Sequence, residues 1–247
     1  MGQQTKDRLF WLHVKKSAGM STRRMLGPLY TEVERGKKPA CFIQSRPEEY
    51  NDILNNYRVV LGEYQFRRCL FAKKFLYPDD FDRHFKVAFS RNPIDRCVSQ
   101  FFYMWHKPGR KRDLKLRLMM AKQRRFSGRL EYNFDRFLAA IEEARQSESN
   151  SWPHGLHFQT HTAAMWPDIV DENDTVLLDC IYRLEDLTLG VNHIRETLDQ
   201  PPLEPDNSVR TNTSSKSAFA PSSDQVRKIE ELFGKDFDIY EGLCERF

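Results

Sequence analysis

The stretch from residue 9 to residue 30 constrains the fold of this chain more than any other. Residues 9–14 (LFWLHV) are a short, mostly apolar run, typical of a strand in a parallel sheet that is covered on both faces. Small residues follow, with two lysines and one glycine. Ser21 and Thr22 are favourable N-cap residues, so we expect a helix from Arg23 onward.

A strand, a tight turn and a helix N-terminus together make an anion-binding site. The free backbone N–H groups and the positive end of the helix dipole face the same point. The nucleotide-triphosphatase pattern G-x-x-x-x-G-K-[ST] is absent, because Lys15 and Lys16 precede Gly19. On these residues alone, an ordinary strand–turn–helix with solvated lysines is an equally good interpretation.

The length of 247 residues suits one well-buried domain spanning 1–247. The five cysteines are widely spaced without a C-x-x-C pair, which favours reduced thiols over disulfides or zinc. No run of about 18 apolar residues exists, so we expect no membrane span. Since the N-terminus also lacks the apolar core of a signal peptide, we expect a cytoplasmic protein; a luminal protein whose membrane anchor precedes Met1 is the alternative.

Further strands are predicted at residues 57–63, 85–90 and 175–182, alternating with helices. Residues 147–161 are expected to form a loop, and the last helix to begin at Ser222 with a capping box and run to Phe233. The predicted fold class is α/β, with a mainly parallel central sheet flanked by helices. Lys16, Glu63 and Arg91 each follow a predicted strand, which would place them along one edge of the sheet.

The second strong signal begins at Arg91, directly after a predicted strand. Pro93 suits the first position of a helix, and Ser99 lies two helical turns further on. An arginine fork and a serine hydroxyl can bind the same phosphate group. A surface arginine with a helix-packing serine is the simpler alternative.

These two signals together resemble sulfotransferases. Residues 13–21 (HVKKSAGMS) are similar to their 5′-phosphosulfate loop, which reads H-V-P-K-T-G-G-T-S in carbohydrate and bacterial members. Residues 91–99 (RNPIDRCVS) are similar to their 3′-phosphate motif, R-x-P-x-x-R-x-x-S. The loop matches at Lys16, Gly19 and Ser21, and departs at Lys15, Ala18 and Met20, where the family has proline, glycine and threonine.

The resemblance implies a P-loop-like sulfotransferase fold, 3′-phosphoadenosine 5′-phosphosulfate (PAPS) as sulfuryl donor and no metal. The carried-over donor-binding residues are Lys16, Ser17, Ala18, Gly19, Met20, Ser21, Thr22, Arg91, Ser99 and Arg183. Lys16 would stabilise charge on the leaving oxygen, while Lys15 is expected to be a solvated neighbour. A serine-rich loop at residues 212–216 would close over the donor.

An acceptor hydroxyl needs a base. Glu63 takes the place of the G-H histidine that many family members carry, so we expect it to be catalytic; pairing with Arg67 is the alternative. His13 is expected to pack beneath the loop. His154, His157 and His161 lack a nearby carboxylate or cysteine at zinc-ligand spacing, although one of them could face the acceptor.

Residues 107–129 carry ten basic residues against one acidic residue. They suit either a solvated helix face or a lid that attracts an anionic glycan. Nucleic acid is not favoured, because aromatic residues for base stacking are sparse there. The prediction is thus a sulfotransferase acting on a hydroxyl of a carbohydrate. Its rivals are a nucleotide-dependent kinase with a degenerate phosphate loop and a non-catalytic polyanion-binding module.

Overall fold

A parallel sheet forms the centre of the molecule. The computed structural model describes residues 6, 8–26, 60–106, 130–147, 153–203 and 219–245. Within these ranges the sheet has four parallel strands in the order β1-β2-β3-β4. They are β1 (Arg8–Leu12), β2 (His84–Ser90), β3 (Cys180–Arg183) and β4 (Cys244–Glu245). The predicted α/β class with a parallel sheet is confirmed.

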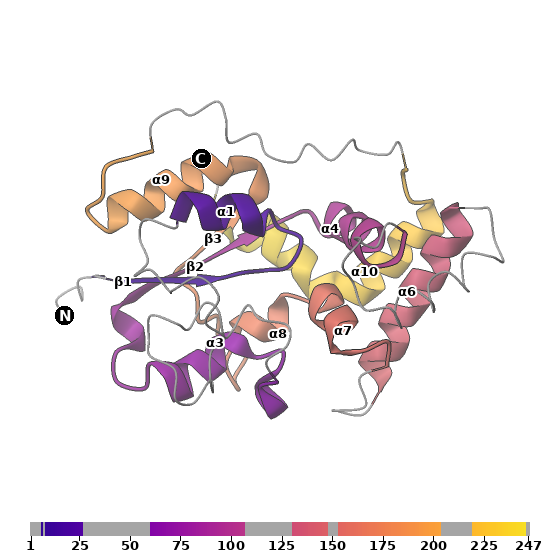
Figure 1. The fold of residues 1–247 in the computed structure, drawn as a ribbon, viewed down its shortest axis with the longest axis horizontal. Coiled ribbons are helices and arrows are strands. Elements are labelled where there is room, and N and C mark those ends of the chain that lie inside the picture. Colours follow the sequence, from indigo (N-terminus) through magenta and orange to yellow (C-terminus); the bar gives the residue numbers. More distant parts are fainter. Residues whose placement is uncertain are drawn as a thin grey trace.

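Both faces of the sheet are covered, as the apolar strand at residues 9–14 predicted. Leu9 and Trp11 pack toward α1 (Gly19–Leu26) and α9 (Leu187–Thr197). Phe10 and Leu12 point to the opposite face, toward α3 (Arg68–Phe71) and α8 (Trp166–Ile169). Figure 1 shows α1 and α9 on one side of the strands and α3 and α8 on the other. The two-residue period of a strand explains this division.

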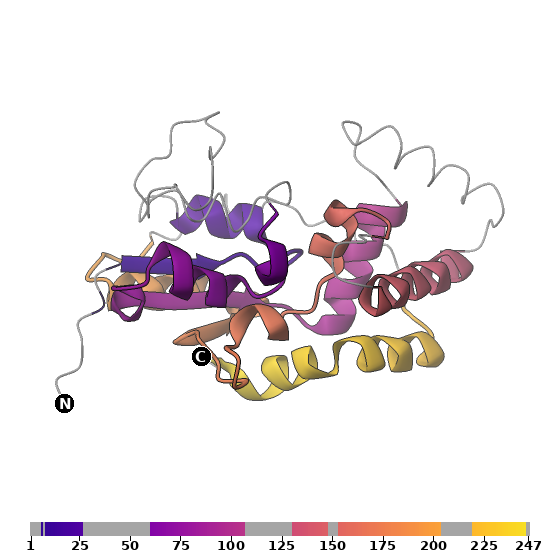
Figure 2. The same ribbon diagram turned by 90° about the horizontal axis from the view of Figure 1, so that it is seen from below.

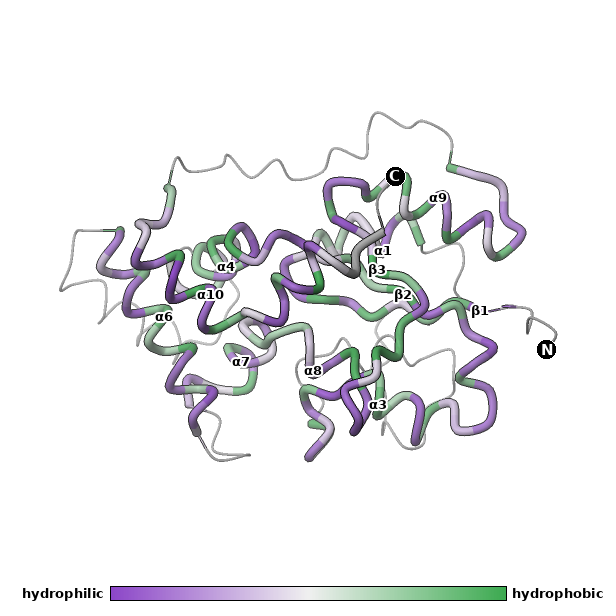
Figure 3. Tube along the Cα trace, turned by 180° about the vertical axis from the view of Figure 1, so that it is seen from behind, coloured by the Kyte–Doolittle hydropathy of each residue, from purple (hydrophilic) through white to green (hydrophobic). Residues whose placement is uncertain are grey.

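A second group of helices packs beside the sheet around its own aromatic core. It contains α4 (Pro93–Phe101), α6 (Leu130–Gln146), α7 (Leu156–Thr162) and α10 (Ser223–Asp238). Phe101, Phe134 and Phe137 are fully buried at its centre. Figure 2 shows α10 running from this group to the region beneath the strands. In Figure 3 the central strands are mostly hydrophobic, whereas α6 and α10 alternate between hydrophobic and hydrophilic residues, as amphipathic helices do.

Shorter elements connect these parts. They are η3 (Gly62–Tyr64), η4 (Ala72–Leu76), η5 (Phe81–Arg83), η6 (Phe102–His106), η7 (Leu184–Asp186) and η9 (Ile239–Leu243). The η6 segment continues α4 directly as a π-helical turn, a feature often found at functional sites.

Several predicted elements are wrong in type or extent. Residues 62–64 form the 3₁₀ turn η3 where the end of a strand at 57–63 was predicted, and residues 57–59 lie outside the described ranges. The strand predicted at 175–182 occupies only Cys180–Arg183. The loop predicted at 147–161 contains the start of α7. Helix α1 begins at Gly19, so Ser21 and Thr22 lie within its first turn and do not cap it.

The ends of α4 and α10 follow the prediction. Pro93 occupies the first turn of α4. Ser222 and Gln225 form the predicted capping box of α10, in which Ser222 Oγ accepts from Gln225 N at 3.4 Å. The helix was predicted to end at Phe233, where the backbone does leave helical geometry (φ −130°, ψ 22°), but it resumes and continues to Asp238. None of the helices in the described ranges is long and apolar enough to cross a membrane.

Candidate functional site

Parallel strands bring the predicted donor residues to one edge of the sheet. The strand pairing places Leu12 opposite Ala88 and Ser90 opposite Arg183, so β1, β2 and β3 end side by side. Lys16 follows β1, Arg91 follows β2, and Arg183 is the last residue of β3. Glu63 lies in η3 and does not follow a described strand.

The loop after β1 has the backbone of an anion cradle. Lys16 (φ 69°) and Ala18 (φ 50°) both adopt the left-handed region, which non-glycine residues rarely do. Such turns point successive N–H groups to one side, and here they lead into the N-terminus of α1. Ser17 is buried, and its Oγ has no hydrogen-bond partner among the described residues. A buried hydroxyl without a partner is costly, so this loop fits a bound anion.

Position 19 requires glycine because the His13 side chain lies very close to it, and not because of the turn geometry. A Cβ atom on Gly19 would lie 1.8 Å from Nε2 of His13. The His13 ring stacks on Trp11, with centroids 5.2 Å apart, and burial lowers its pKa well below the usual value. As predicted, His13 therefore packs beneath the loop, and it does so as a neutral ring.

Lys16 is held against an aromatic platform. Its Nζ lies 4.0 Å from the centre of the Tyr103 ring in η6. Tyr103 in turn stacks on His161 of α7, with ring centroids 5.1 Å apart. Burial, reinforced by His157, lowers the pKa of His161 to about 2, so this ring is neutral. The platform ties Lys16 to the element that extends α4.

The other residues of the loop differ in their surroundings. Thr22 is buried, and its Oγ1 donates to Ala18 O at 3.3 Å, which leaves that hydroxyl occupied within the helix. Ser21 is half-buried. The expectation of a solvated Lys15 is wrong, because this residue is only 9 % exposed. Met20 is 79 % exposed, so its side chain faces solvent where the family pattern has threonine. Backbone N–H groups remain the donors that these positions can offer an anion.

Arg91 and Ser99 occupy the two ends of the α4 unit as predicted. Asn92 caps α4, and its side chain accepts from Ile94 N at 3.0 Å and Asp95 N at 3.3 Å. This cap fixes the chain as it leaves β2, and Arg91 lies between the strand end and the cap. Arg91 and Ser99 are both half-buried. No ion pair of the Arg91 side chain occurs within the described residues.

Arg183 reaches the sheet edge but is engaged elsewhere. It donates from Nη2 to Tyr240 O at 2.9 Å, and its guanidinium lies 4.5 Å from the centre of the Tyr240 ring. Its Nη2 also lies 3.6 Å from Glu241 Oε2, and its buried Nε has no partner among the described residues. The structure thus gives Arg183 a packing role that the sequence did not predict.

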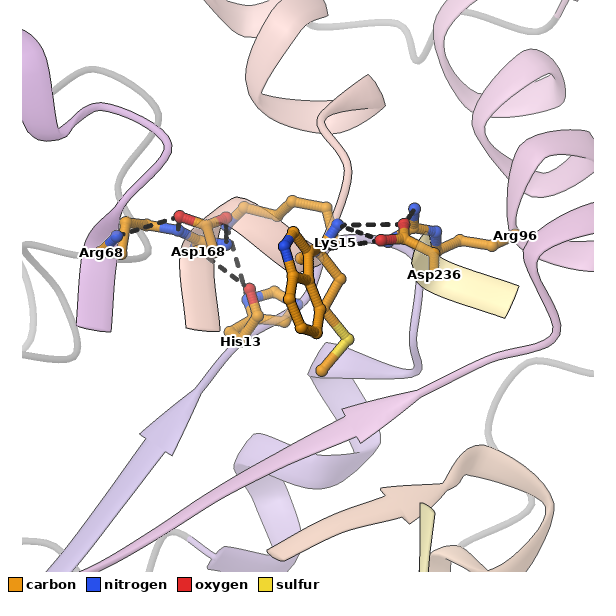
Figure 4. A network of polar contacts seen from close by, with 8 residues as sticks. His13, Lys15, Arg68, Arg96, Asp168 and Asp236 are labelled. Atoms are coloured by element: carbon orange, nitrogen blue, oxygen red, sulfur yellow. Dashed lines mark hydrogen bonds and ion pairs between the residues drawn. The ribbon is translucent and has the colours of Figure 1, made fainter. Parts of the chain in front are cut away.

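Two buried ion pairs fix the elements around the loop (Figure 4). Arg68 of α3 contacts Asp168 of α8 through Nε at 3.0 Å and Nη2 at 2.7 Å, and its Nη1 donates to His13 O at 3.2 Å. Arg96 of α4 pairs with Asp236 of α10. Sequence patterns do not predict either pair, because the partners are 100 and 140 residues apart.

Glu63 is exposed and lines a cavity of about 430 Å³. The cavity lies between η3 and helices α6, α7 and α8, and its polar lining includes Arg67, Arg145 and Gln159. Lys16 is not part of its lining, but α7 connects the two places, with His157 and His161 near Tyr103 and Gln159 beside the cavity. The described ranges contain no cluster of three side chains suited to a metal ion.

The sequence did not identify Tyr103 as part of the site, and it named His161 only as one of three histidines that could face the acceptor. The sequence feature that could have placed His161 beside His157 is their i, i+4 spacing. This spacing is informative only once α7 is known to be a helix. Residues 107–129 and 212–216, predicted to form a basic lid and a closing loop, lie outside the described residues.

Fold and site together define an α/β protein whose loop at the carboxyl ends of adjacent parallel strands has a backbone suited to an anion. A model of the sulfotransferase family matches residues 3–241. The chain belongs to this family, whose members transfer sulfuryl groups. No curated protein and no solved structure shows a significant match.

Proposed function

We propose that this protein transfers a sulfuryl group from PAPS to a carbohydrate hydroxyl. One observation carries the proposal: the Lys16 loop, with its unpartnered Ser17 hydroxyl, and Arg91 leave adjacent ends of parallel strands. This arrangement offers anion donors at two separate points, as a nucleotide with phosphate groups at both its 5′ and 3′ positions requires.

Different residues bind different parts of the donor. The backbone of residues 17–22 and the Ser17 hydroxyl hold the phosphosulfate, and Arg91 with Ser99 binds the 3′-phosphate. Arg183 contacts the nucleotide through N–H groups that Tyr240 does not engage. During transfer the bond from sulfur to the phosphate oxygen breaks and a bond to the acceptor oxygen forms. Lys16, positioned by Tyr103, neutralises the charge that develops on the departing phosphate oxygen.

The acceptor occupies the cavity that Glu63 lines, and Glu63 takes the proton of the reacting hydroxyl. Two arginines, Arg67 and Arg145, line the same cavity, and no ion pair of either occurs within the described residues. Their charge favours an anionic glycan as acceptor. Lys16 does not line the cavity, so this assignment requires the sulfuryl group of the bound donor to reach the hydroxyl beside Glu63.

We place the whole chain, residues 1–247, in one domain with a cytoplasmic location. Residues 107–129 would then serve as a basic lid over the acceptor.

Sulfuryl transfer can be followed directly with donor labelled with ³⁵S and a panel of neutral and acidic glycans. We expect Glu63→Gln to lower kcat by about 10²–10⁴-fold while leaving the Kd of the spent donor unchanged. We expect Lys16→Met to lower kcat by about 10²–10³-fold. Glu196→Gln, at an exposed site on α9, is the matched control and should behave as wild type. Full activity of Glu63→Gln would assign the base to another residue.

A further inference from the structure

The cavity that Glu63 lines has one apolar side. Ile141 belongs to the buried aromatic core of the helical group, and Ala144 and Ala164 pack against that core. We call this side the apolar wall; it is formed by residues of α6, of α8 and of the segment between α7 and α8, namely Ile141, Ala144, Ala163, Ala164 and Pro167. The wall is therefore continuous with the protein interior.

Three alanines keep the apolar wall clear of large side chains. Ala144, Ala163 and Ala164 each end at Cβ, and the cavity beside them has a volume of about 430 Å³. A volume of this order accommodates an aromatic ring or a short alkyl chain. Apolar surface that faces water is unfavourable, so a ligand group that covers the wall gains its transfer free energy.

The neutral polar side chains of the cavity lining already bond to the backbone. These bonds are Ser147 Oγ to Ala144 O at 2.9 Å, Thr162 Oγ1 to Phe158 O at 2.9 Å, Gln159 Nε2 to Pro153 O at 3.3 Å and Leu61 N to Gln65 Oε1 at 2.8 Å, with the first atom of each pair donating. Both hydroxyl protons and one polar atom of each amide are thus engaged within the protein. These side chains offer a ligand fewer hydrogen bonds than their residue types suggest.

The charged residues of the cavity lining are Glu63, Arg67 and Arg145. Glu63 lies in η3, and Arg67 directly precedes α3. The Arg145 guanidinium lies 4.4 Å from the centre of the Phe233 ring, which compensates part of its charge. Burial lowers the pKa of Arg145 to about 10, so this group is still charged at neutral pH. Strong polar partners for a ligand are therefore few, and the apolar wall contributes none.

A sugar ring matches the apolar wall poorly. Such a ring carries a hydroxyl group on most of its carbon atoms, and each hydroxyl that is buried without a partner costs free energy. An aryl or alkyl group needs no hydrogen-bond partner and gains free energy from the same contact. The wall therefore suits a part of the acceptor that has no hydroxyl groups.

We propose that the apolar wall binds an aryl or alkyl group that the acceptor carries. The acceptor is then amphiphilic: its reacting sugar hydroxyl lies beside Glu63, and an apolar substituent of the same molecule covers the wall. This inference rests on the proposed function, which places the acceptor in this cavity. It adds an apolar requirement to the acceptor, which the charges of Arg67 and Arg145 do not predict.

Three glucuronides that differ only in their aglycone test the inference. Methyl, phenyl and octyl β-D-glucuronide present the same hydroxyl groups and the same carboxylate, so a difference between them comes from the apolar group. We expect the KM for sulfuryl transfer to be about 10–100-fold lower for the phenyl or the octyl compound than for the methyl compound. The comparison of phenyl with octyl distinguishes an aromatic from an aliphatic substituent. Calorimetry with each glucuronide measures binding independently of transfer.

Two substitutions assign the preference to the apolar wall. Ala144→Leu and Ala164→Leu each place additional carbon atoms in the cavity, so both should remove most of the difference in KM between the glucuronides. An unchanged Kd for 3′-phosphoadenosine 5′-phosphate, the spent donor, shows that a variant is folded. The matched control is Ala139→Leu, at an exposed site of α6 outside the cavity lining, which should retain the wild-type difference.

The outcomes separate this inference from the proposed function. Equal KM and Kd values for the three glucuronides in wild type would overturn the inference and leave the proposed function intact. A preference that persists in both leucine variants also overturns it, because the apolar group then binds elsewhere. Tighter binding of the phenyl or octyl compound, lost in the leucine variants, without transfer to any acceptor would support the wall as a ligand site and overturn the proposed function. Absence of both binding and transfer would overturn both.

Discussion

At the scale of single residues, the donor loop depends on how closely Gly19 approaches His13. The His13 ring cannot easily retreat, because it stacks on Trp11 and lies beneath the helix start. This contact explains a glycine at a position where the backbone has ordinary helical geometry. The same contact orders the N–H groups at the start of α1.

We expect Gly19→Ala to reduce the free energy of unfolding by about 1–3 kcal/mol, because the added Cβ overpacks His13. Urea denaturation measures the change. Gly234→Ala is the matched control: its Cβ would meet no atom within 4 Å in α10, so this variant should be neutral or more stable by up to about 1 kcal/mol. Equal effects of the two variants would contradict the role of the close approach.

At the scale of elements, α10 holds the helical group and the sheet together through one carboxylate. Asp236 pairs with Arg96 and accepts from Met165 N at 2.9 Å and Trp166 N at 3.0 Å. It therefore joins α10 to α4 and to the start of α8. The departure from helical geometry at Phe233 lies one turn before this residue.

We expect Asp236→Ala to destabilise the fold by about 3–5 kcal/mol, since it leaves the Arg96 guanidinium buried without its partner. Thermal and urea unfolding report the loss. Asp238→Ala, at an exposed site on the same helix, should change stability by no more than about 0.5 kcal/mol. A small effect at Asp236 would show that the carboxylate does not join these helices.

At the scale of the whole molecule, local sequence patterns predicted the elements that build the donor edge. Pro93 and the capping box of α10 depend on neighbours in sequence, and both were confirmed. The strand predicted at residues 9–14 was confirmed as β1, although it ends at Leu12. The α7 helix was missed because residues 147–161 are polar and histidine-rich. The Arg68–Asp168 pair and the contact of Lys16 with Tyr103 join distant segments, so no local pattern reveals them.

Donor binding at Arg91 is the central requirement of the proposed function. We therefore expect 3′-phosphoadenosine 5′-phosphate to bind wild type with a Kd near 1 μM, which is about −8 kcal/mol. Loss of a charged hydrogen bond in Arg91→Ala should weaken binding about 10–100-fold. Arg136→Ala, at an exposed site on α6, should bind as wild type does. No binding by wild type, with ATP binding in its place, would contradict the account and favour a kinase.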